Sequence, residues 1–103
     1  MGTIKVYHGS LTPRGYDNLV MWGPSKNKQF FVTRSKSLAL QAANGEERRV
    51  LEYEVPEDRV AEILGEEKPY AGMIGEGTQF AVEGSRAQDL HNFLNPKQKR
   101  SLY

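Results

Sequence analysis

No cysteine occurs among the 103 residues of this chain, and that absence excludes several kinds of chemistry. Disulfide bonds, thiolate nucleophiles and cysteine-ligated zinc sites all require this residue. Histidine is scarce as well, because His8 and His91 are the only two, and they lack the spacing of a metal-ligand motif. A chain without cysteine also suits a reducing compartment.

Long apolar runs and a surplus of charge of one sign are also missing. No segment approaches the roughly 20 apolar residues that a membrane-spanning helix needs. The first residues, Met1 to Ile4, have neither the basic start nor the apolar centre of a signal peptide. The 14 lysine and arginine residues nearly balance 13 acidic residues, which leaves a net charge of +1. We therefore expect a cytoplasmic protein that has no membrane partner.

The length and composition indicate one small globular domain. A chain of this size forms a single modest core, and its hydrophobic fraction of 38% is ordinary for such a domain. We place the domain at residues 1–96 and a basic tail at residues 97–103, which we expect to fray. Together with Arg48 and Arg49, this tail offers the one route to a nucleic acid partner, which the near-neutral net charge disfavours.

Four segments have the patterns of β-strands. Apolar and polar residues alternate over Ile4–Tyr7 and over Arg49–Val55, as in a strand with one buried face. Aromatic and β-branched residues are concentrated over Gln29–Thr33 and Thr78–Val82. These segments predict a small mixed or antiparallel β core.

Two or three short helices are expected between and after these strands. The first has Ser35 or Ser37 as its N-cap, and the second begins at Pro56. The third begins with the segment from Ser85 to Gln88, which has the spacing of a capping box. Strands and short helices in this order predict an α+β fold.

Two long segments rich in glycine and proline separate these elements. They span Ser10–Lys28 and Glu66–Gly77, and we expect both to be irregular loops. Long loops in small domains are usually functional. The second contains Gly72–Gly77, which is glycine-rich but lacks the lysine of a phosphate-binding loop.

His8 is the first candidate for a ligand-contacting residue. It lies at the end of the first expected strand, which would fix the imidazole, and Gly9 after it would let a ligand approach the backbone. A serine hydrolase triad built on Ser10 and His8 lacks the nucleophile elbow that such enzymes have. His91 is expected at the surface or at the boundary of the core.

Three short motifs occur in a familiar order along residues 4 to 84. The first spans Tyr7 to Ser10, and the second spans Phe30 to Ser35 with a downstream Ala-x-x-x-Ala. The third is an acidic residue shortly before the last strand. In this order the chain resembles the ADP-ribosyltransferase fold. It is closer to the branch of diphtheria toxin and poly(ADP-ribose) polymerase, with its His-Tyr-Glu signature, than to the Arg-Ser-Glu branch.

The resemblance implies that NAD is the substrate and gives roles to the matching residues. His8 would hydrogen-bond the ribose next to nicotinamide, and the Gly9 backbone would pair with the carboxamide. Phe31 would stack on the nicotinamide ring, while Arg14 would face the pyrophosphate. The residues implied to bind NAD are His8, Gly9, Ser10, Arg14, Phe31, Thr33 and Ser35.

This chain departs most from the family pattern at the position of the catalytic glutamate. Its place, directly before the Phe80–Val82 segment, is occupied by Gln79. A neutral amide can bind a hydroxyl group but cannot offset positive charge as a carboxylate does. We therefore expect Glu76, three residues earlier, as the catalytic acid, with Gln79 as the alternative; His8 completes the predicted catalytic set.

A second departure from the family concerns the aromatic side chains that stack on the nicotinamide ring. Ala42 stands near the position of a second tyrosine in this branch of the family. Nicotinamide would then be stacked on one side only, unless Tyr16, Trp22 or Tyr70 supplies the other side.

We thus expect a small mono-ADP-ribosyltransferase that cleaves NAD and transfers ADP-ribose to a macromolecular acceptor, in the first place a protein. Compact enzymes of this kind fit bacterial toxins or phage effectors. The alternative is a non-catalytic protein-interaction module on the same or another small α+β scaffold.

Overall fold

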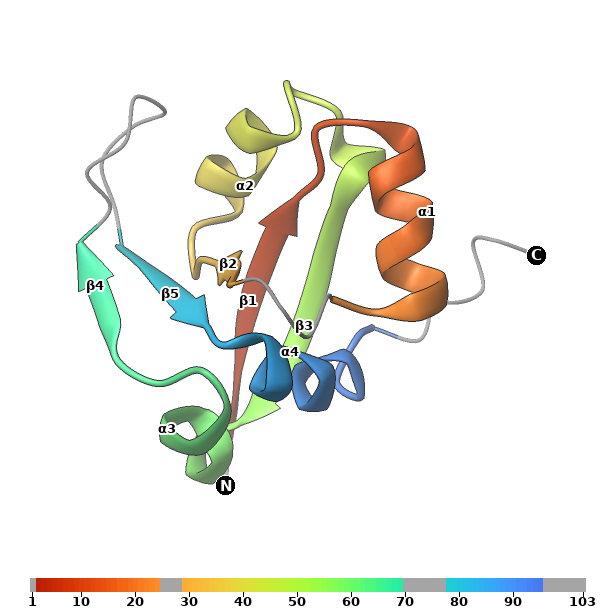
Figure 1. The fold of residues 1–103 in the computed structure, drawn as a ribbon. Coiled ribbons are helices and arrows are strands. Elements are labelled where there is room, and N and C mark those ends of the chain that lie inside the picture. Colours follow the sequence, from red (N-terminus) through yellow and green to blue (C-terminus); the bar gives the residue numbers. More distant parts are fainter. Residues whose placement is uncertain (1, 25–28, 70–77, 96–103) are drawn as a thin grey trace.

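The computed structural model describes residues 2–24, 29–69 and 78–95, which form an α+β fold with two antiparallel sheets (Figure 1). The predicted α+β class is confirmed, although the described residues contain four α-helices rather than two or three. The strands are β1 (Thr3–Gly9), β2 (Phe30–Val32), β3 (Val50–Pro56), β4 (Glu67–Pro69) and β5 (Thr78–Val82). The α-helices are α1 (Pro13–Trp22), α2 (Lys36–Ala42), α3 (Val60–Ile63) and α4 (Gly84–His91), with 3-10 turns at Glu47–Arg49 and Glu57–Arg59.

The first sheet is the antiparallel pair of β1 and β3. Val6 lies opposite Tyr53, and both side chains are completely buried on one face. The alternation predicted for β3 is confirmed, because Leu51 and Val55 are buried on the same face as Tyr53, whereas Glu54 is exposed. This face is the main contribution of the first sheet to the core.

The second sheet has the order β2-β5-β4, and both pairings are antiparallel. One of its faces is buried through Phe30, Val32, Phe80 and Val82, which join the core that the first sheet begins. Phe31 points to the other face and keeps 45% of its surface exposed. The alternation within β2 therefore separates one core phenylalanine from one that a ligand can reach.

Among the described residues, one pair exchanges backbone hydrogen bonds between the two sheets. The Tyr7 N–H donates to the Thr33 carbonyl at 2.7 Å, and the Thr33 N–H donates to the Tyr7 carbonyl at 2.9 Å. β1 therefore has β3 along one edge and touches the end of β2 along the other.

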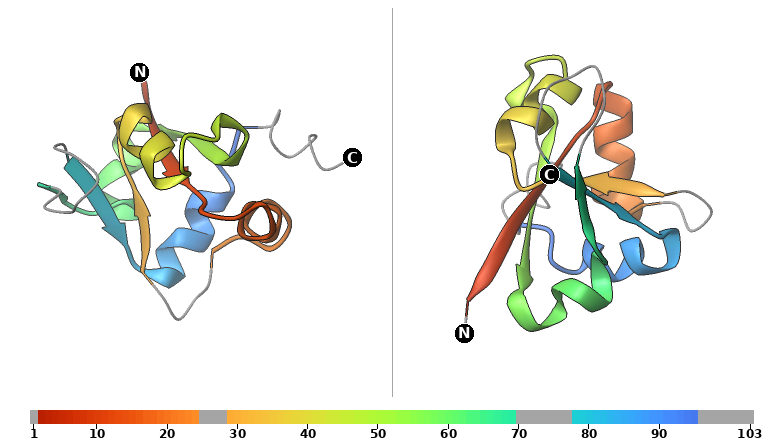
Figure 2. Two further views of the ribbon diagram at one scale, coloured as in Figure 1. Left: turned by 90° about the horizontal axis from the view of Figure 1, so that it is seen from above. Right: turned by 90° about the vertical axis from the view of Figure 1, so that its left-hand side faces the viewer.

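Figure 1 shows α1 and α2 on opposite sides of the ribbon formed by β1 and β3. Tyr16 and Val20 of α1 belong to the main core, whereas Ala39 and Ala43 form a smaller cluster with Val50. α3 and α4 contact each other and lie toward the end of the molecule where β1 begins (Figure 2). Within the described residues, no helix has the length and apolar character needed to cross a membrane.

The prediction of an irregular loop over Ser10–Lys28 is wrong, because α1 occupies its middle. The Thr12 hydroxyl caps this helix by accepting a 3.0 Å hydrogen bond from the Gly15 N–H, and Pro13 follows at the first helical position. Tyr16 and Val20, four residues apart, give the helix its buried side. Proline and glycine near a helix start were thus mistaken for signs of a loop.

Two smaller corrections concern the second half of the chain. Part of the expected Glu66–Gly77 loop is strand β4, while residues 70–77 lie outside the described part. The capping box from Ser85 to Gln88 is not formed, because α4 already begins at Gly84, after Glu83 as its N-cap. By contrast, Ser35 caps α2 as one of the two predicted candidates, accepting from the Leu38 N–H at 3.3 Å.

These caps give a test of the fold in solution. We expect Thr12→Ala to lower the free energy of unfolding by about 1 kcal/mol, because the start of α1 loses its capping bond. The matched change Ser85→Ala should leave stability unchanged or slightly raised, because Ser85 lies inside α4 and caps nothing. Urea unfolding measures both, and a larger loss for Ser85→Ala would contradict this assignment of the helix starts.

Candidate functional site

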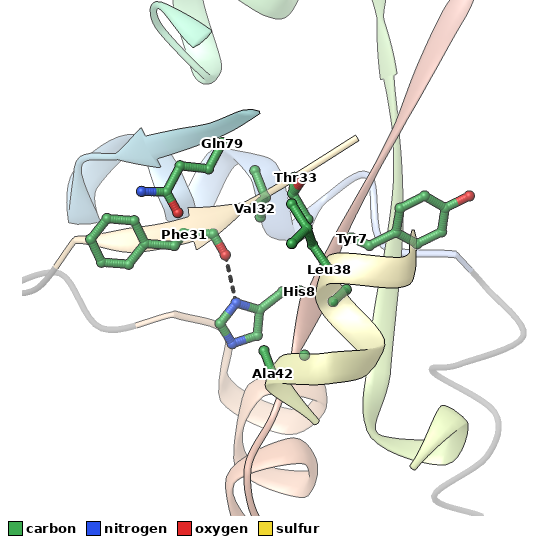
Figure 3. A pocket seen from close by; sticks show the side chains of 10 residues that line it. Tyr7, His8, Phe31, Val32, Thr33, Leu38, Ala42 and Gln79 are labelled. Carbon is green, nitrogen blue, oxygen red and sulfur yellow. Dashed lines mark hydrogen bonds between the residues drawn. The ribbon is translucent and has the colours of Figure 1, made fainter. Parts of the chain in front are cut away.

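A cavity of about 290 Å³ opens where β1 and β2 separate (Figure 3). Both sheets contribute to its walls, together with α2. No charged side chain occurs among the described residues that line it, and most of the lining is apolar. The lining residues are Tyr7, His8, Gly9, Phe31, Val32, Thr33, Leu38, Ala39, Ala42 and Gln79.

The cavity lies at the point where the ladder between β1 and β2 stops. Since Tyr7 and Thr33 exchange two hydrogen bonds, a continued antiparallel ladder would next pair Gly9 with Phe31 in the same way. That pair is not formed. Instead, the Phe31 carbonyl accepts a 2.6 Å hydrogen bond from Nδ1 of His8. The imidazole therefore satisfies a carbonyl that the Gly9 N–H would otherwise have satisfied.

The tautomer of His8 follows from this bond. A carbonyl oxygen only accepts hydrogen bonds, so Nδ1 carries the proton, and Nε2 of the neutral ring is an acceptor. Burial lowers the pKa of His8 below its ordinary value of 6.5, although the bond to Phe31 acts in the opposite direction. At pH 7 the side chain is therefore neutral and offers Nε2 to a hydrogen-bond donor.

The imidazole of His8 is held in its orientation by Phe30, which in turn packs against Tyr53. It stacks on Phe30, with 4.2 Å between the ring centroids and 28° between the planes. Tyr53 in turn packs edge-on against Phe30, with 6.1 Å between centroids. The strand β2 thus holds His8 twice, through the ring of Phe30 and through the carbonyl of Phe31.

Gly9 presents its backbone to the cavity. The Ser10 N–H donates to the Arg49 carbonyl, so Gly9 and Val50 form one of the pairs of β1 and β3 that exchange no hydrogen bonds. The N–H and C=O groups of Gly9 therefore point away from β3, to the side where β2 has separated. Within the described residues, one backbone donor and one backbone acceptor thus remain for a ligand.

Gly9 also lies where α2 packs on β1, which leaves no room for a side chain and which the sequence did not reveal. A Cβ atom there would collide with the Ala39 carbonyl oxygen of α2 and would lie 2.9 Å from the Ala43 nitrogen. Gly9 therefore allows α2 to pack closely on β1, as well as leaving the backbone open.

Three other predicted NAD-binding residues come from β2 and from the segment that connects it to α2. Phe31 and Thr33 line the cavity. Thr33 is buried, and its hydroxyl accepts a 3.1 Å hydrogen bond from the Ser35 N–H. Ser35 itself does not line the cavity, because its side chain caps α2. It acts on the site only by positioning that helix.

Ser10 and Arg14 are not brought to the cavity. Ser10 is buried, and its carbonyl accepts a hydrogen bond from Nε of Arg49 at 3.2 Å. Arg14 lies exposed on α1, so its predicted contact with the pyrophosphate has no support from the lining of the cavity.

Of the two candidates for the catalytic position, Gln79 lines the cavity, and its amide lies next to Phe31 in Figure 3. Glu76 lies outside the described residues. Among the described residues of the lining, the cavity therefore has an amide but no carboxylate.

The α2 wall of the cavity is built from small apolar residues. Ala42 lines it, at the position where the resemblance would place a tyrosine. Tyr16 is buried in the core and Trp22 is 74% exposed on α1, so neither supplies a second aromatic wall; Tyr70 lies outside the described residues.

Sequence reasoning missed several lining residues. Leu38 and Ala39 of α2 and Tyr7 of β1 line it but were not among the residues predicted to bind NAD. Their part in the cavity depends on where β1 and β2 separate, which no local sequence pattern encodes. His91, the other histidine, is half buried on α4 and does not line the cavity.

Comparison of the chain with protein-family models, curated proteins and solved structures gave no significant match.

The packing role of Gly9 is testable without a ligand. We expect Gly9→Ala to destabilise the fold by about 1–3 kcal/mol, because α2 must move to admit the methyl group. Gly2→Ala is the matched control, since its methyl group would meet only the end of the Glu57 side chain. If urea unfolding gives equal stabilities for the two variants, the close contact between β1 and α2 does not exist in solution.

The lowered pKa of His8 predicts a dependence of stability on pH. The unfolded chain takes up a proton near pH 6.5, whereas the folded chain does so only at lower pH. His8 therefore stabilises the fold fully above pH 6.5, and this contribution falls as the pH drops toward the folded pKa.

The urea midpoint of the wild type should thus fall more between pH 7.5 and pH 5 than that of His8→Gln. The glutamine can still donate to the Phe31 carbonyl but does not titrate, and the other acidic and histidine residues are common to both proteins. Parallel declines would show that the pKa of His8 is not lowered.

Proposed function

We propose that the chain is a mono-ADP-ribosyltransferase that binds NAD with the nicotinamide ring in the cavity between β1 and β2. The observation that carries this proposal is the free backbone edge at Gly9 beside the acceptor Nε2 of His8. It agrees with the roles that the family resemblance implies for these two residues.

A primary carboxamide fits the Gly9 edge. Such a group has an N–H donor and a C=O acceptor in one plane, and Gly9 offers one acceptor and one donor in the same direction. The lining around it is largely apolar, as suits a flat aromatic ring, and it contains no described cation that would repel the positively charged nicotinamide of NAD. The exposed ring of Phe31 supplies an aromatic surface for stacking.

The ribose attached to nicotinamide fits the acceptor on His8. A ribose hydroxyl can donate to Nε2, which is free to accept because Nδ1 carries the only proton of the neutral ring. The bond from Nδ1 to Phe31 and the stack on Phe30 hold the ring in place before the ligand arrives. Little ordering of this side chain is then needed on binding.

The proposed reaction breaks the bond between the nicotinamide nitrogen and C1′ of the ribose. Nicotinamide leaves with the bonding electron pair, positive charge develops on the ribose, and a nucleophile of the protein acceptor forms the new bond to C1′ and loses its proton. A carboxylate near the ribose would lower the barrier by stabilising that charge. Glu76 is proposed for this role, with Gln79 binding a ribose hydroxyl.

The second candidate function is binding of NAD or a related ligand without turnover. It is favoured by one observation, that Gln79 rather than an acid lines the cavity among the described residues. An amide holds the hydroxyl but does not offset the charge of the transition state.

Binding of NAD tests both candidates. We expect His8→Ala to weaken NAD about tenfold, because one hydrogen bond worth about 1 kcal/mol and a rigid contact are lost. His91→Ala is the matched control, since that histidine does not line the cavity. Calorimetry with NAD measures the affinities; if the wild type binds no NAD, both candidates fail.

Turnover separates the two candidates. If the chain is a transferase, nicotinamide release from NAD in the presence of protein acceptors should fall by about 10²–10³-fold in Glu76→Gln, with little change in NAD affinity. In the same assay Gln79→Glu should retain activity or increase it. NAD binding without nicotinamide release by the wild type would leave the non-catalytic function.

A further inference from the structure

The outer face of the three-stranded sheet extends the cavity toward a lysine. Residues directly opposite each other in an antiparallel pair lie on the same face, as do residues two apart in one strand. Phe31 lies opposite Ala81, and Gln79 lies opposite Lys68. These four residues therefore share one face. The other face is buried through Phe30, Val32, Phe80 and Val82.

Lys68 is the next side chain beyond Gln79 on this face. Directly opposed residues have Cβ atoms about 4.5–5.5 Å apart, so the lysine stands immediately beside a residue that lines the cavity. Lys68 is exposed, and its long flexible side chain can place the ammonium group over the rim of the cavity.

The neighbouring cations are engaged elsewhere. Nε of Arg34 lies 3.4 Å from a carboxylate oxygen of Glu67, and Nζ of Lys36 lies 2.9 Å from one of Glu47. Lys68 forms no ion pair with another described residue. The paired residues of its sheet face, moreover, include no acid, because Glu67 lies opposite Phe80 on the other face. Among the described residues, Lys68 thus adds a positive charge without an acidic partner beside a cavity whose lining carries no charge.

We propose that Lys68 binds a phosphate group of the ligand whose nicotinamide ring occupies the cavity. The inference rests on the proposed function and adds to it the pyrophosphate contact that the cavity itself does not supply. It assigns that contact to β4 rather than to Arg14 on α1. The ligand then runs from Gly9 and His8, past Phe31 and Gln79, to Lys68. Lys68 serves as a positioning and affinity-determining residue for anionic ligands.

The test compares a ligand with phosphates and one without. NAD and nicotinamide riboside share the nicotinamide and its ribose, but only NAD carries the pyrophosphate. We expect Lys68→Gln to weaken NAD about tenfold, as for the loss of a charge-assisted hydrogen bond, and to leave the riboside unchanged. The dependence of NAD affinity on salt should also decrease, because one cation no longer contributes.

Lys5→Gln is the matched control, because Lys5 is an exposed lysine on β1 that does not line the cavity. It should leave both affinities unchanged. If Lys68→Gln and Lys5→Gln behave alike while the wild type binds NAD, the role of Lys68 is refuted and the proposed function stands. If the wild type binds neither NAD nor the riboside, the proposed function fails, and the role of Lys68 fails with it.

Discussion

Two hydrogen bonds between Tyr7 and Thr33 determine how the rest of this structure is arranged. Within the described residues, they are the one place where strands of the two sheets exchange backbone bonds. They fix the end of β2 against β1, and the strands separate directly afterwards. The cavity, the free backbone of Gly9 and the bond from His8 to Phe31 all follow from a ladder that stops after one pair.

Three consecutive residues of β1 have different tasks because successive residues of a strand face different ways. Tyr7 directs its backbone toward β2, and His8 directs its side chain onto Phe30. Gly9 has two roles: α2 packs against its Cα, and its N–H and C=O groups face the cavity. A glycine at such a place is therefore not by itself a sign of a ligand, and only the free backbone groups argue for one.

The sequence was sufficient where local patterns decide the structure. Alternation predicted β1 and β3, and aromatic and β-branched residues predicted β2 and β5, because burial on one face leaves a period of two. α1 was missed because Pro13 and Gly15 are common in both loops and first helical turns, and only the cap formed by Thr12 separates the two. His8, Phe31 and Gln79 were singled out through the family resemblance and line one cavity, whereas the role of Phe30 beneath His8 depends on how two sheets meet. That junction is a long-range property which no local pattern contains.

The charge around Gln79 bears on whether this cavity performs chemistry. In the proposed reaction, the positive charge of the nicotinamide ring moves to the ribose as nicotinamide leaves, and a free cation that lies nearer to the ribose than to the ring raises the barrier. An unpaired Lys68 thus opposes the reaction, whereas a Lys68 neutralised by a phosphate of the bound ligand opposes it much less. The phosphate contact therefore makes the lysine compatible with catalysis, but it supplies no stabilisation of its own. That stabilisation requires a carboxylate at the ribose, so the distinction between transfer and simple binding depends on Glu76 and not on the residues already gathered in the cavity.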